Sequence, residues 1–589
     1  MPSNTLSQEV SVGLGRLSVD DVVRVARDKV RVADLAPEVE DQMRPAADWV
    51  ASTVKQITGA RRNGQEPQAY YGINTGFGAL AGRSALDSKY LGEVLGRNLM
   101  ASHSVGAGPF FDEAVVRAVL LIRAQSLAQG ISGVRPLIPR ILLAMLNRGV
   151  YPAIPEQGSL GASGDLAPFA HLLLAMCETP SPEAGDVDLE LDTTDGEAFV
   201  PAQHMEDGAS GYQITEDYQS GRQMLWRRVS GAEAMKPVGG KIALQAKEAL
   251  ALMNGSTFST GLAALVIRDA QNVLDNFELA VAMTLEGIRG FRDPFYPHLH
   301  RARGHESAER VGSRILGYLE GSQLLDEGDL RTNPRRIPPQ DPYSVRCAPQ
   351  VMGTFADVLD MARRWVEMDI NAVTDNPLIF TDLDRDYKTM SGGNFHGEPI
   401  AMAMDFLGIA LTELGSIADR RMFMLNTYYP NKTHGLPEFL VDEPKRTEGL
   451  NTGLMMLQAT AAALVSDCKT LAHPDSVDSI PSSGNQEDHV SMSLNAARHA
   501  REIVKNIENV AALELLCAAQ AIALQMAKPG NGNLQPGRGT QAAYQAIRAA
   551  GITPLKQDLV LYPEIRTALR LVRSGALVCA AREAGGQGK

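Results

Sequence analysis

The chain has 589 residues, which is more than one hydrophobic core usually serves, so we expect more than one domain. Its formal net charge of −13 argues against a nucleic-acid-binding surface. Five scattered cysteines without CxxC spacing indicate reduced thiols, and the first residues lack a signal-peptide pattern, so we expect a cytoplasmic protein. The chain has no long uncharged apolar run, so we expect no membrane span.

Long helical patterns dominate after residue 112. Apolar residues recur every three to four positions in six segments, and this spacing predicts helices with a buried face. The segments are 112–131, 256–288, 348–373, 400–425, 448–472 and 491–526. Such long helices must bury against each other, so we expect an all-α fold with a central bundle of long, roughly antiparallel helices. We expect a smaller N-terminal domain over 1–240, which carries the active-site loops, the bundle over 241–530, and a C-terminal helical segment over 531–589.

Residues 178–217 differ from their surroundings, because they hold twelve Asp or Glu and no Lys or Arg. This composition predicts a solvated loop within a longer acidic excursion, 178–236. The tripeptide Ala209-Ser210-Gly211 lies inside it. A hydrated loop gives a reactive group no fixed geometry, so we expect no chemistry at this tripeptide.

Another copy of the tripeptide, Ala162-Ser163-Gly164, precedes the apolar helix pattern "DLAPFAHLLLAM". Asp165 is a good N-cap, and Pro168 falls in the first turn, where a missing N–H costs nothing. The plain interpretation is a tight turn before a helix. The alternative is self-processing, in which the Gly164 amide nitrogen attacks the Ala162 carbonyl, a five-membered ring closes, and dehydration leaves Ser163 as a methylene group. Such a product is an electrophile that no ordinary side chain supplies.

The stretch "GSLGASGDLAPFAHL" (158–172) resembles the cofactor-forming motif of the aromatic amino acid ammonia-lyase and aminomutase family. Members of that family build 4-methylidene-imidazole-5-one (MIO) from Ala-Ser-Gly. The resemblance implies that MIO forms autocatalytically from residues 162–164, with no metal or nucleotide. It also implies a fumarase/aspartase-like helical superfold and a homotetramer with shared active sites. Further segments resemble the family, in its order, from about residue 71 to 492.

"YYGINTGFGAL" (70–80) resembles the catalytic tyrosine loop of the family and assigns Tyr71 as the base that removes a β-proton from the substrate. A free phenol has a pKa near ~10, so positive charge or hydrogen bonds must lower the pKa of Tyr71. The glycines Gly72, Gly76 and Gly78 predict a mobile lid. The plain alternative is a glycine-rich turn with a packed aromatic ring.

Other matching segments supply substrate-binding candidates. "QDPYSVRCAPQVMG" (340–353) resembles the substrate-carboxylate segment, where the planar guanidinium of Arg346 suits a bidentate carboxylate pair. "ALALMNGSTFSTG" (249–261) contributes Asn254, whose amide would stabilise charge that arrives on the ring. The remaining candidates by matching position are Gln340, Tyr343, Asn376, Phe395 and Glu487. Arg346 alone also fits a bridge at a helix start, and the acidic cluster at 487 also fits a helix cap.

The substrate is indicated by Ser102-His103, where the resemblance places Phe-Leu in phenylalanine-acting and His-Leu in tyrosine-acting relatives. "NFHGEP", "GLPEFLV" and "NQEDHVSM" also resemble the histidine-acting branch. His103 and Glu487 would pair with the imidazole nitrogens of a histidine substrate. The alternative for His103 is a satisfied core histidine. The resemblance thus implies elimination of ammonia from L-histidine to give trans-urocanate.

Two related reactions stay open. An aminomutase that converts L-histidine to β-histidine would use the same residues, and the long lead before Tyr71 and the acidic segment favour it. An ammonia-lyase acting on tyrosine or phenylalanine is the other.

Rival classes find less support in the sequence. A fumarase/aspartase-type enzyme would use a "GSSxMPxKxN" loop, which the sequence lacks. A helical scaffold without chemistry would not need Tyr71 and Ser163. The histidines of "YPHLHRARGHE" (His298, His300 and His305) lack a supporting carboxylate or cysteine cluster, so we expect no metal site.

Overall fold

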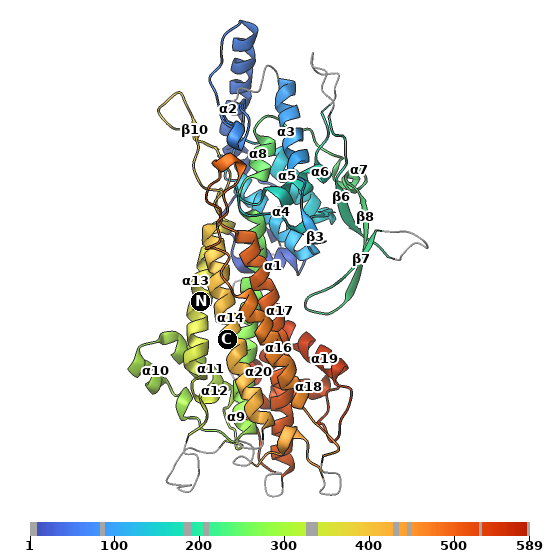
Figure 1. Cartoon of the computed structure of the whole chain (residues 1–589), viewed down its shortest axis with the longest axis vertical. Helices are drawn as coiled ribbons and strands as arrows, with labels where there is room; N and C mark the ends of the chain where they lie inside the picture. Colours follow the sequence, from blue (N-terminus) through green and yellow to red (C-terminus); the bar gives the residue numbers. More distant parts are fainter. Residues whose placement is uncertain are drawn as a thin grey trace.

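The computed structural model describes residues 9–82, 89–180, 191–203, 211–325, 340–427, 435–443, 449–528 and 533–585. Long helices run side by side through its lower half, and a group of shorter helices and strands covers their upper end (Figure 1). The bundle helices are α9 (Thr257–Gly287), α13 (Ala348–Ile370), α14 (Glu398–Asn426), α16 (Met455–Leu471) and α17 (Ser493–Ala527). The all-α prediction is confirmed, although α16 begins several residues later than predicted.

The bundle forms because its helices are apolar around much of their circumference. α9 is buried over most of its length and packs against α17, where Gly287 allows the two backbones to approach: a Cβ at Gly287 would lie 2.6 Å from the Cβ of Ala521. By length and composition alone, α14 and α17 could each cross a membrane. Most of both apolar stretches is buried within the protein, however, which is what a core helix requires.

The upper part contains the N-terminal elements. They are β1 (Glu9–Val10), α1 (Val19–Ala26), β2 (Arg31–Val32), α2 (Pro37–Arg62), α3 (Lys89–His103), β3 (Ala107–Phe110), α4 (Glu113–Leu127), α5 (Leu137–Arg148), β5 (Pro155–Gln157), α6 (Leu166–Met176), α7 (Gly231–Ala234) and α8 (Glu248–Met253). One cluster of buried apolar side chains extends from Val10 to Ala581, so these elements share a core with the bundle. The domain boundaries at 240 and 530 stay a prediction.

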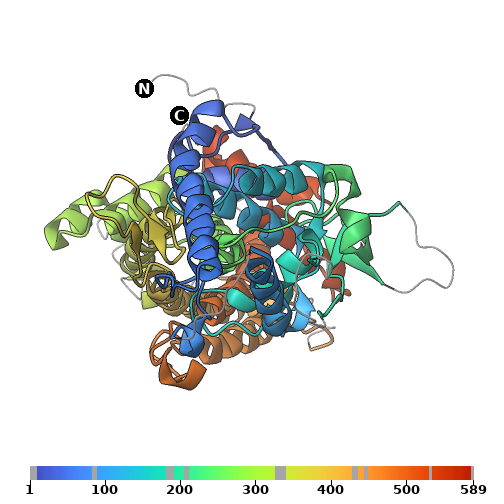
Figure 2. The same ribbon diagram turned by 90° about the horizontal axis from the view of Figure 1, so that it is seen from above.

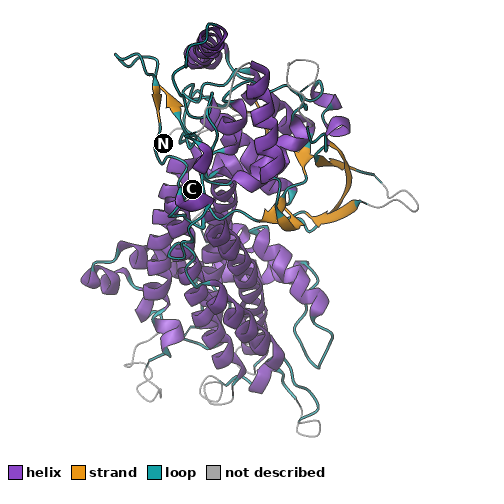
Figure 3. Ribbon diagram, turned by 45° about the horizontal axis from the view of Figure 1, so that its top comes forward, coloured by secondary structure: helices purple, strands orange, loops and turns teal. Residues whose placement is uncertain are grey.

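A four-stranded antiparallel sheet stands at one side of the upper part (Figures 2 and 3). Its order is β4 (Tyr151–Pro152), β6 (Glu197–Pro201), β8 (Gln223–Ser230) and β7 (Tyr212–Glu216). The prediction of a loop over 178–217 is therefore wrong in part, because β6 and β7 fall within it. Ala198 and Phe199 are buried, whereas Glu197 on β6 and Glu216 on β7 are exposed. Residues 181–190 and 204–210, which include Ala209 and Ser210, lie outside the described residues.

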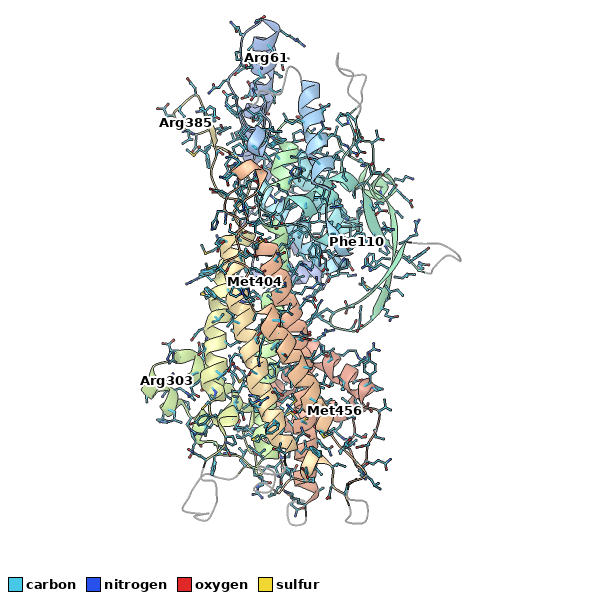
Figure 4. All side chains as sticks on the ribbon, viewed as in Figure 1. Arg61, Phe110, Arg303, Arg385, Met404 and Met456 are labelled. Carbon is cyan, nitrogen blue, oxygen red and sulfur yellow. The ribbon has the colours of Figure 1, made fainter. Side chains whose placement is uncertain are left out.

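Shorter elements flank the lower bundle. α10 (Pro297–Arg303), α11 (Glu306–Tyr318) and α12 (Tyr343–Arg346) lie on one side, and α18 (Arg538–Ala549), α19 (Tyr562–Arg573) and α20 (Ala576–Ala584) lie on the other. Figure 4 labels Arg303 on α10 and Met456 at the start of the bundle helix α16. The pair β9 (Leu378–Ile379) and β10 (Thr389–Met390) projects near the upper end. The protein is thus elongated, with distinct upper and lower ends.

Candidate active site

A cavity of about 340 Å³ lies in the upper part of the molecule. Five segments that are far apart in the sequence line it: the tyrosine loop, the end of α3, the turn before α6, Leu250 of α8 and the turn before α17. The candidate residues among its lining are Tyr71, His103, Ala162, Ser163, Gly164 and Glu487. The structure therefore brings half of the predicted site residues together within one chain.

The turn before α6 has an unusual backbone. Ser163 has φ +52° and Gly164 has φ +85°, so two successive residues are left-handed. The Gly164 N–H donates to the Gly161 carbonyl (3.1 Å), and the Gly255 N–H donates to the Ser163 carbonyl (3.0 Å). A Cβ built on Gly164 would lie 2.2 Å from the carbonyl carbon of Gly255, so only glycine fits. Tight, strained backbone with glycine at this position is what ring closure across 162–164 requires.

This close approach predicts the effect of Gly164→Ala. The left-handed conformation and the overlap with Gly255 together should lower the free energy of unfolding by about 2–4 kcal/mol. Urea denaturation measures this loss. Gly239→Ala is the matched control, because Gly239 has φ +100° with nothing within 4 Å of an added Cβ. If the two variants lose the same stability, the overlap at Gly164 contributes nothing.

Asp165 follows the turn and begins α6 as predicted, with Pro168 in the first turn. Its carboxylate does not cap α6, however. It accepts hydrogen bonds from the Ser259 N–H (2.9 Å), the Ser259 hydroxyl (3.0 Å) and the Ser159 hydroxyl (3.1 Å). Ser259 lies in the first turn of α9, where free N–H groups need acceptors. Asp165 therefore ties the turn to a central bundle helix, and burial raises the pKa of its carboxyl.

Tyr71 reaches the cavity from the glycine-rich loop. Its hydroxyl oxygen accepts a hydrogen bond from the Gly78 N–H (3.3 Å), and its ring packs edge-on against Phe77. Burial raises the pKa of Tyr71; the Gly78 hydrogen bond opposes this, and the charge of Glu487 adds to it. The prediction that this pKa is lowered is wrong for the single chain, because neither neighbour carries positive charge. The missing cation would have to come from substrate, cofactor or another subunit.

The tyrosine loop rests on a turn that precedes α17. A Cβ built on Gly78 would lie 2.7 Å from the Ser483 hydroxyl and 3.5 Å from a Glu487 carboxylate oxygen. Ser483 was not predicted as a site residue, although the serines before "GNQED" mark a polar turn. This contact places Glu487 beside Tyr71. The lid motion of the loop stays a prediction.

His103 ends α3 and lines the cavity. Its Nδ1 lies 2.9 Å from the Leu99 carbonyl oxygen, which can only accept, and 2.9 Å from the Ser102 hydroxyl, which can donate or accept. In the tautomer whose Nδ1 hydrogen is donated to the Leu99 carbonyl, Nε2 is the acceptor. A histidine here can receive an N–H from a polar substrate ring.

Asn254 and Asn376 lie next to the turn rather than in the cavity lining. Both are buried, and the Asn254 side-chain amide donates to the backbone carbonyl of Asn376 (2.9 Å). The Asn254 Oδ1 is buried without a hydrogen-bond partner. Asn376 in turn is held by Ser391 and by the Gly392 N–H. One hydrogen of the Asn254 amide is thus used within the protein.

The remaining candidates lie away from this cavity. Tyr343 and Arg346 form α12, where the Arg346 guanidinium lies over the Tyr343 ring, and the Tyr343 residue is 70% exposed. The Ser344 carbonyl of α12 accepts from Arg421, near the far end of α14. Since a helix rises about 1.5 Å per residue, the 23 steps along α14 from Glu398 to Arg421 span about 35 Å.

The near end of α14 lies at the turn before α6. Gly397 approaches Ser491 at the start of α17, and the next residue, Met492, donates its N–H to the Leu160 carbonyl (3.1 Å). α12 therefore lies about 35 Å from the turn, at the opposite end of the bundle (Figure 1). Gln340, just before α12, is exposed, and Phe395, just before α14, is half-buried; neither lines the cavity.

The histidines considered as metal ligands do not form a centre. His300 is buried on α10, and both of its ring nitrogens lack a hydrogen-bond partner. Among the described residues, no group of three or more His, Cys, Asp or Glu side chains is arranged to hold a metal ion.

The fold and the cavity define a helical-bundle protein with a tight, left-handed Ala-Ser-Gly turn beside a tyrosine. Comparison with known families agrees: the sequence profile of the aromatic amino acid lyases matches residues 17–549. The chain belongs to the aromatic amino acid lyase family.

Relatives and solved structures in this family match almost the whole chain. A histidine ammonia-lyase from Symbiobacterium thermophilum is 41% identical, over 98% of this chain and 99% of the relative. A second histidine ammonia-lyase, from Geobacillus kaustophilus, is 45% identical over 77% of this chain and 78% of the relative. The structure of a tyrosine aminomutase from Streptomyces globisporus matches with a TM-score of 0.80 at 32% identity, covering 98% of this chain and 99% of that one. Histidine ammonia-lyase from Trypanosoma cruzi matches with a TM-score of 0.76 at 31% identity, covering 98% and 97%.

Proposed function

We propose that the chain is a histidine ammonia-lyase that eliminates ammonia from L-histidine to give trans-urocanate. The observation that carries this proposal is the strained Ser163-Gly164 turn facing the same cavity as Tyr71 and His103. Histidine ammonia-lyases that are 39–45% identical support the reaction and the substrate. Residues 162–164 fit the formation of MIO, because the turn is tight and only glycine fits at 164. MIO would supply an electron-poor methylene group that captures the substrate amine and makes it a leaving group.

The side chains of the cavity have separate tasks in this proposal. Tyr71 removes the β-proton from the substrate, as its place in the loop and its hydroxyl in the cavity indicate. The Nε2 of His103 accepts an N–H from the substrate imidazole, and Glu487 pairs with its other side. Asn254, next to Gly255 behind the turn, would supply an amide hydrogen to MIO and so would stabilise negative charge that arrives there.

We infer that a second copy of the chain completes the site. The α-carboxylate of the substrate needs a cation, and the family motif assigns that task to Arg346, about 35 Å away on α12. Exposed apolar side chains also follow the bundle helices: Phe406, Ile409 and Phe423 on α14, and Met456 on α16 (Figure 4). Burial of this strip against other subunits would favour assembly. A homotetramer places Gln340, Tyr343, Arg346 and Phe395 of neighbouring subunits at each cavity.

Subunit complementation tests this assembly. Tyr71→Phe and Tyr343→Phe should each have little activity as pure oligomers. When the two are unfolded together and refolded, mixed oligomers contain cavities with an intact Tyr71 from one chain and an intact Tyr343 from another, so urocanate formation should return. The rate is followed by ultraviolet absorbance. No gain over the two separately refolded variants would mean that each site uses residues of one chain only.

The reaction is tested by incubating the protein with L-histidine, L-tyrosine and L-phenylalanine. Ultraviolet absorbance detects urocanate and the cinnamates, and chromatography detects β-amino acids. Urocanate without β-histidine supports the proposal. β-Histidine as the main product would select the aminomutase instead, a reaction type also found in the matched tyrosine aminomutase structure. No turnover of any of the three would refute a lyase function.

The cellular site follows from the same assignment. All five cysteines are free, three of them fully buried, which suits a reducing compartment. We therefore propose that the enzyme acts in the cytoplasm.

A further inference from the structure

A fully buried ion pair lies near the turn formed by residues 162–164, but it does not line the cavity. Lys247 Nζ donates to Asp375 Oδ2 at 2.6 Å, and neither side chain is exposed. Lys247 also has φ +73°, a conformation that costs a non-glycine residue energy and persists only where the surroundings hold it. Burying two charges is expensive, so a pair kept at this position calls for a function beyond stability.

The ion pair contacts the Ala162–Gly164 turn indirectly, through the loop that contains Thr374 and then through Gly255. The Asp375 carboxylate also accepts the Asn376 N–H (2.6 Å), which fixes the loop that contains Thr374. Thr374 packs tightly against Gly255. A Cβ built on Gly255 would lie 2.3 Å from the Thr374 hydroxyl and 2.6 Å from the Thr374 carbonyl oxygen. Gly255 in turn presses on Gly164, as described above. The loop that carries Asp375 is therefore in continuous contact, through Gly255, with Gly164, whose amide nitrogen would attack the Ala162 carbonyl.

The same pair joins other parts of the site. Lys247 precedes α8 and Asn254 follows it, so the pair anchors one end of α8 while the Asn254 amide anchors the other to the Asn376 carbonyl. The stem of Lys247 also lies against the tyrosine loop, since its Cδ would be 3.6 Å from a Cβ built on Gly72.

Two more buried charges complete the arrangement. Arg123 is fully buried between the charges of Asp375 and Asp165, with its guanidinium over the Phe169 ring. Two cations and two acids therefore balance beside the turn.

We propose that the Lys247–Asp375 pair is a positioning element for MIO formation: it holds Thr374 and Gly255 as a rigid wall against which residues 162–164 close. The inference rests on the proposed function. Ring closure joins the Gly164 nitrogen to the Ala162 carbonyl carbon. That carbonyl oxygen leaves as water with the amide hydrogens of Ser163 and Gly164, and the Ser163 hydroxyl leaves as water with its Cα hydrogen. No oxidant or co-reactant is needed, so geometry decides the rate.

A rigid wall matters because the attacking nitrogen must be held close to the carbonyl carbon. Misplacement by about 1 Å can slow an intramolecular reaction by up to about a hundredfold. If Thr374 and Gly255 can move, residues 162–164 are no longer held in the strained conformation, and the ring closes slowly even in a chain that is otherwise folded.

The test is the mass of the intact chain. Lys247→Met/Asp375→Asn removes the ion pair while leaving no net charge buried, so the protein should stay folded. We expect freshly purified double variant to keep the mass of the unmodified chain and to lose two waters about tenfold or more slowly than the wild type, during incubation at constant temperature. The melting temperature, measured in parallel, separates slow ring formation from unfolding.

The matched control is Arg27→Met/Asp269→Asn. Arg27 and Asp269 form a largely buried bidentate pair between α1 and α9, with Asp269 about 15 Å along α9 from Ser259. This variant should lose stability but convert fully. If the double variant at 247 and 375 is insoluble, Asp375→Asn alone is used, because burial already lowers the pKa of Lys247 and lets it lose its charge.

Full loss of two waters in the folded Lys247/Asp375 variant, or in Asp375→Asn, would overturn the positioning role. Equal retardation in the Arg27/Asp269 control would also overturn it, since any loss of stability would then explain the effect. The proposed function fails in a different way: the wild-type chain itself would show the unmodified mass.

Discussion

Replacing Ser163 by alanine should abolish turnover, with kcat falling by at least roughly 10³-fold, as when a covalent catalytic residue is removed from an enzyme. The hydroxyl of Ser163 is the group whose loss creates the methylene carbon, and alanine has nothing to eliminate. Ser163 sits at φ +52° on the cavity wall, a conformation that alanine adopts no more easily than serine. We expect little change in stability. Urocanate release and intact mass give the two measurements.

The chain provides its own control for this variant. Ser210 occupies the same place in the other Ala-Ser-Gly tripeptide, so Ser210→Ala makes the same chemical change in the same three-residue context. It should leave both turnover and the two-water loss intact. If Ser163→Ala turns over L-histidine at a rate near that of Ser210→Ala, the electrophile does not come from residues 162–164.

The second large effect is expected for Tyr71→Phe. Phenylalanine keeps the edge-on packing against Phe77 but loses the hydroxyl, so kcat should fall by about 10²–10⁴-fold while KM changes little. Because burial and Glu487 raise the pKa of Tyr71, the basic form is scarce at neutral pH. The kcat/KM of the wild type should therefore rise with pH above neutrality, and this rise should be absent in the variant. Stopped assays of urocanate across the pH range measure both.

Tyr70→Phe is the control, because Tyr70 is the neighbouring residue but faces elsewhere. It stacks on Tyr387, and its hydroxyl donates to Gln68 (3.1 Å). Its loss should leave kcat and the pH profile unchanged. An alkaline limb that persists in Tyr71→Phe would assign the base to another group, with Glu487 as the next candidate.

The helical fold was predictable because its periodic apolar patterns are long. α9 and α17 follow the three-to-four spacing over many turns, and packing acts in the same direction. The sheet was missed because β6 and β7 are short and lie within a segment whose overall composition is acidic, although each strand contains only one acidic residue and β6 places Ala198 and Phe199 in the core. Pairing with distant strands, which composition does not reveal, decided their structure.

The candidate site was predictable only as a set of residue types. The Ala-Ser-Gly turn and its glycines indicate strain locally, and the structure places Tyr71 and His103 at the same cavity. Which carboxylate serves which helix was not predictable, since Asp165 supports α9 rather than the helix it begins. The Lys247–Asp375 pair was also missed, because contacts between residues more than a hundred positions apart depend on the whole fold.

The position of α12, at the far end of the bundle from the cavity, has a consequence for how the enzyme behaves in dilute solution. In the assembly that we propose, a dissociated chain would hold parts of two different active sites and no complete one. Specific activity should then decline as the protein concentration is lowered. A chain with a defect at one end of the bundle would inactivate only those active sites to which that end contributes. The residual activity of a mixture of intact and defective chains would then depend on how the two kinds of subunit combine in each oligomer, and not only on the fraction of defective chains.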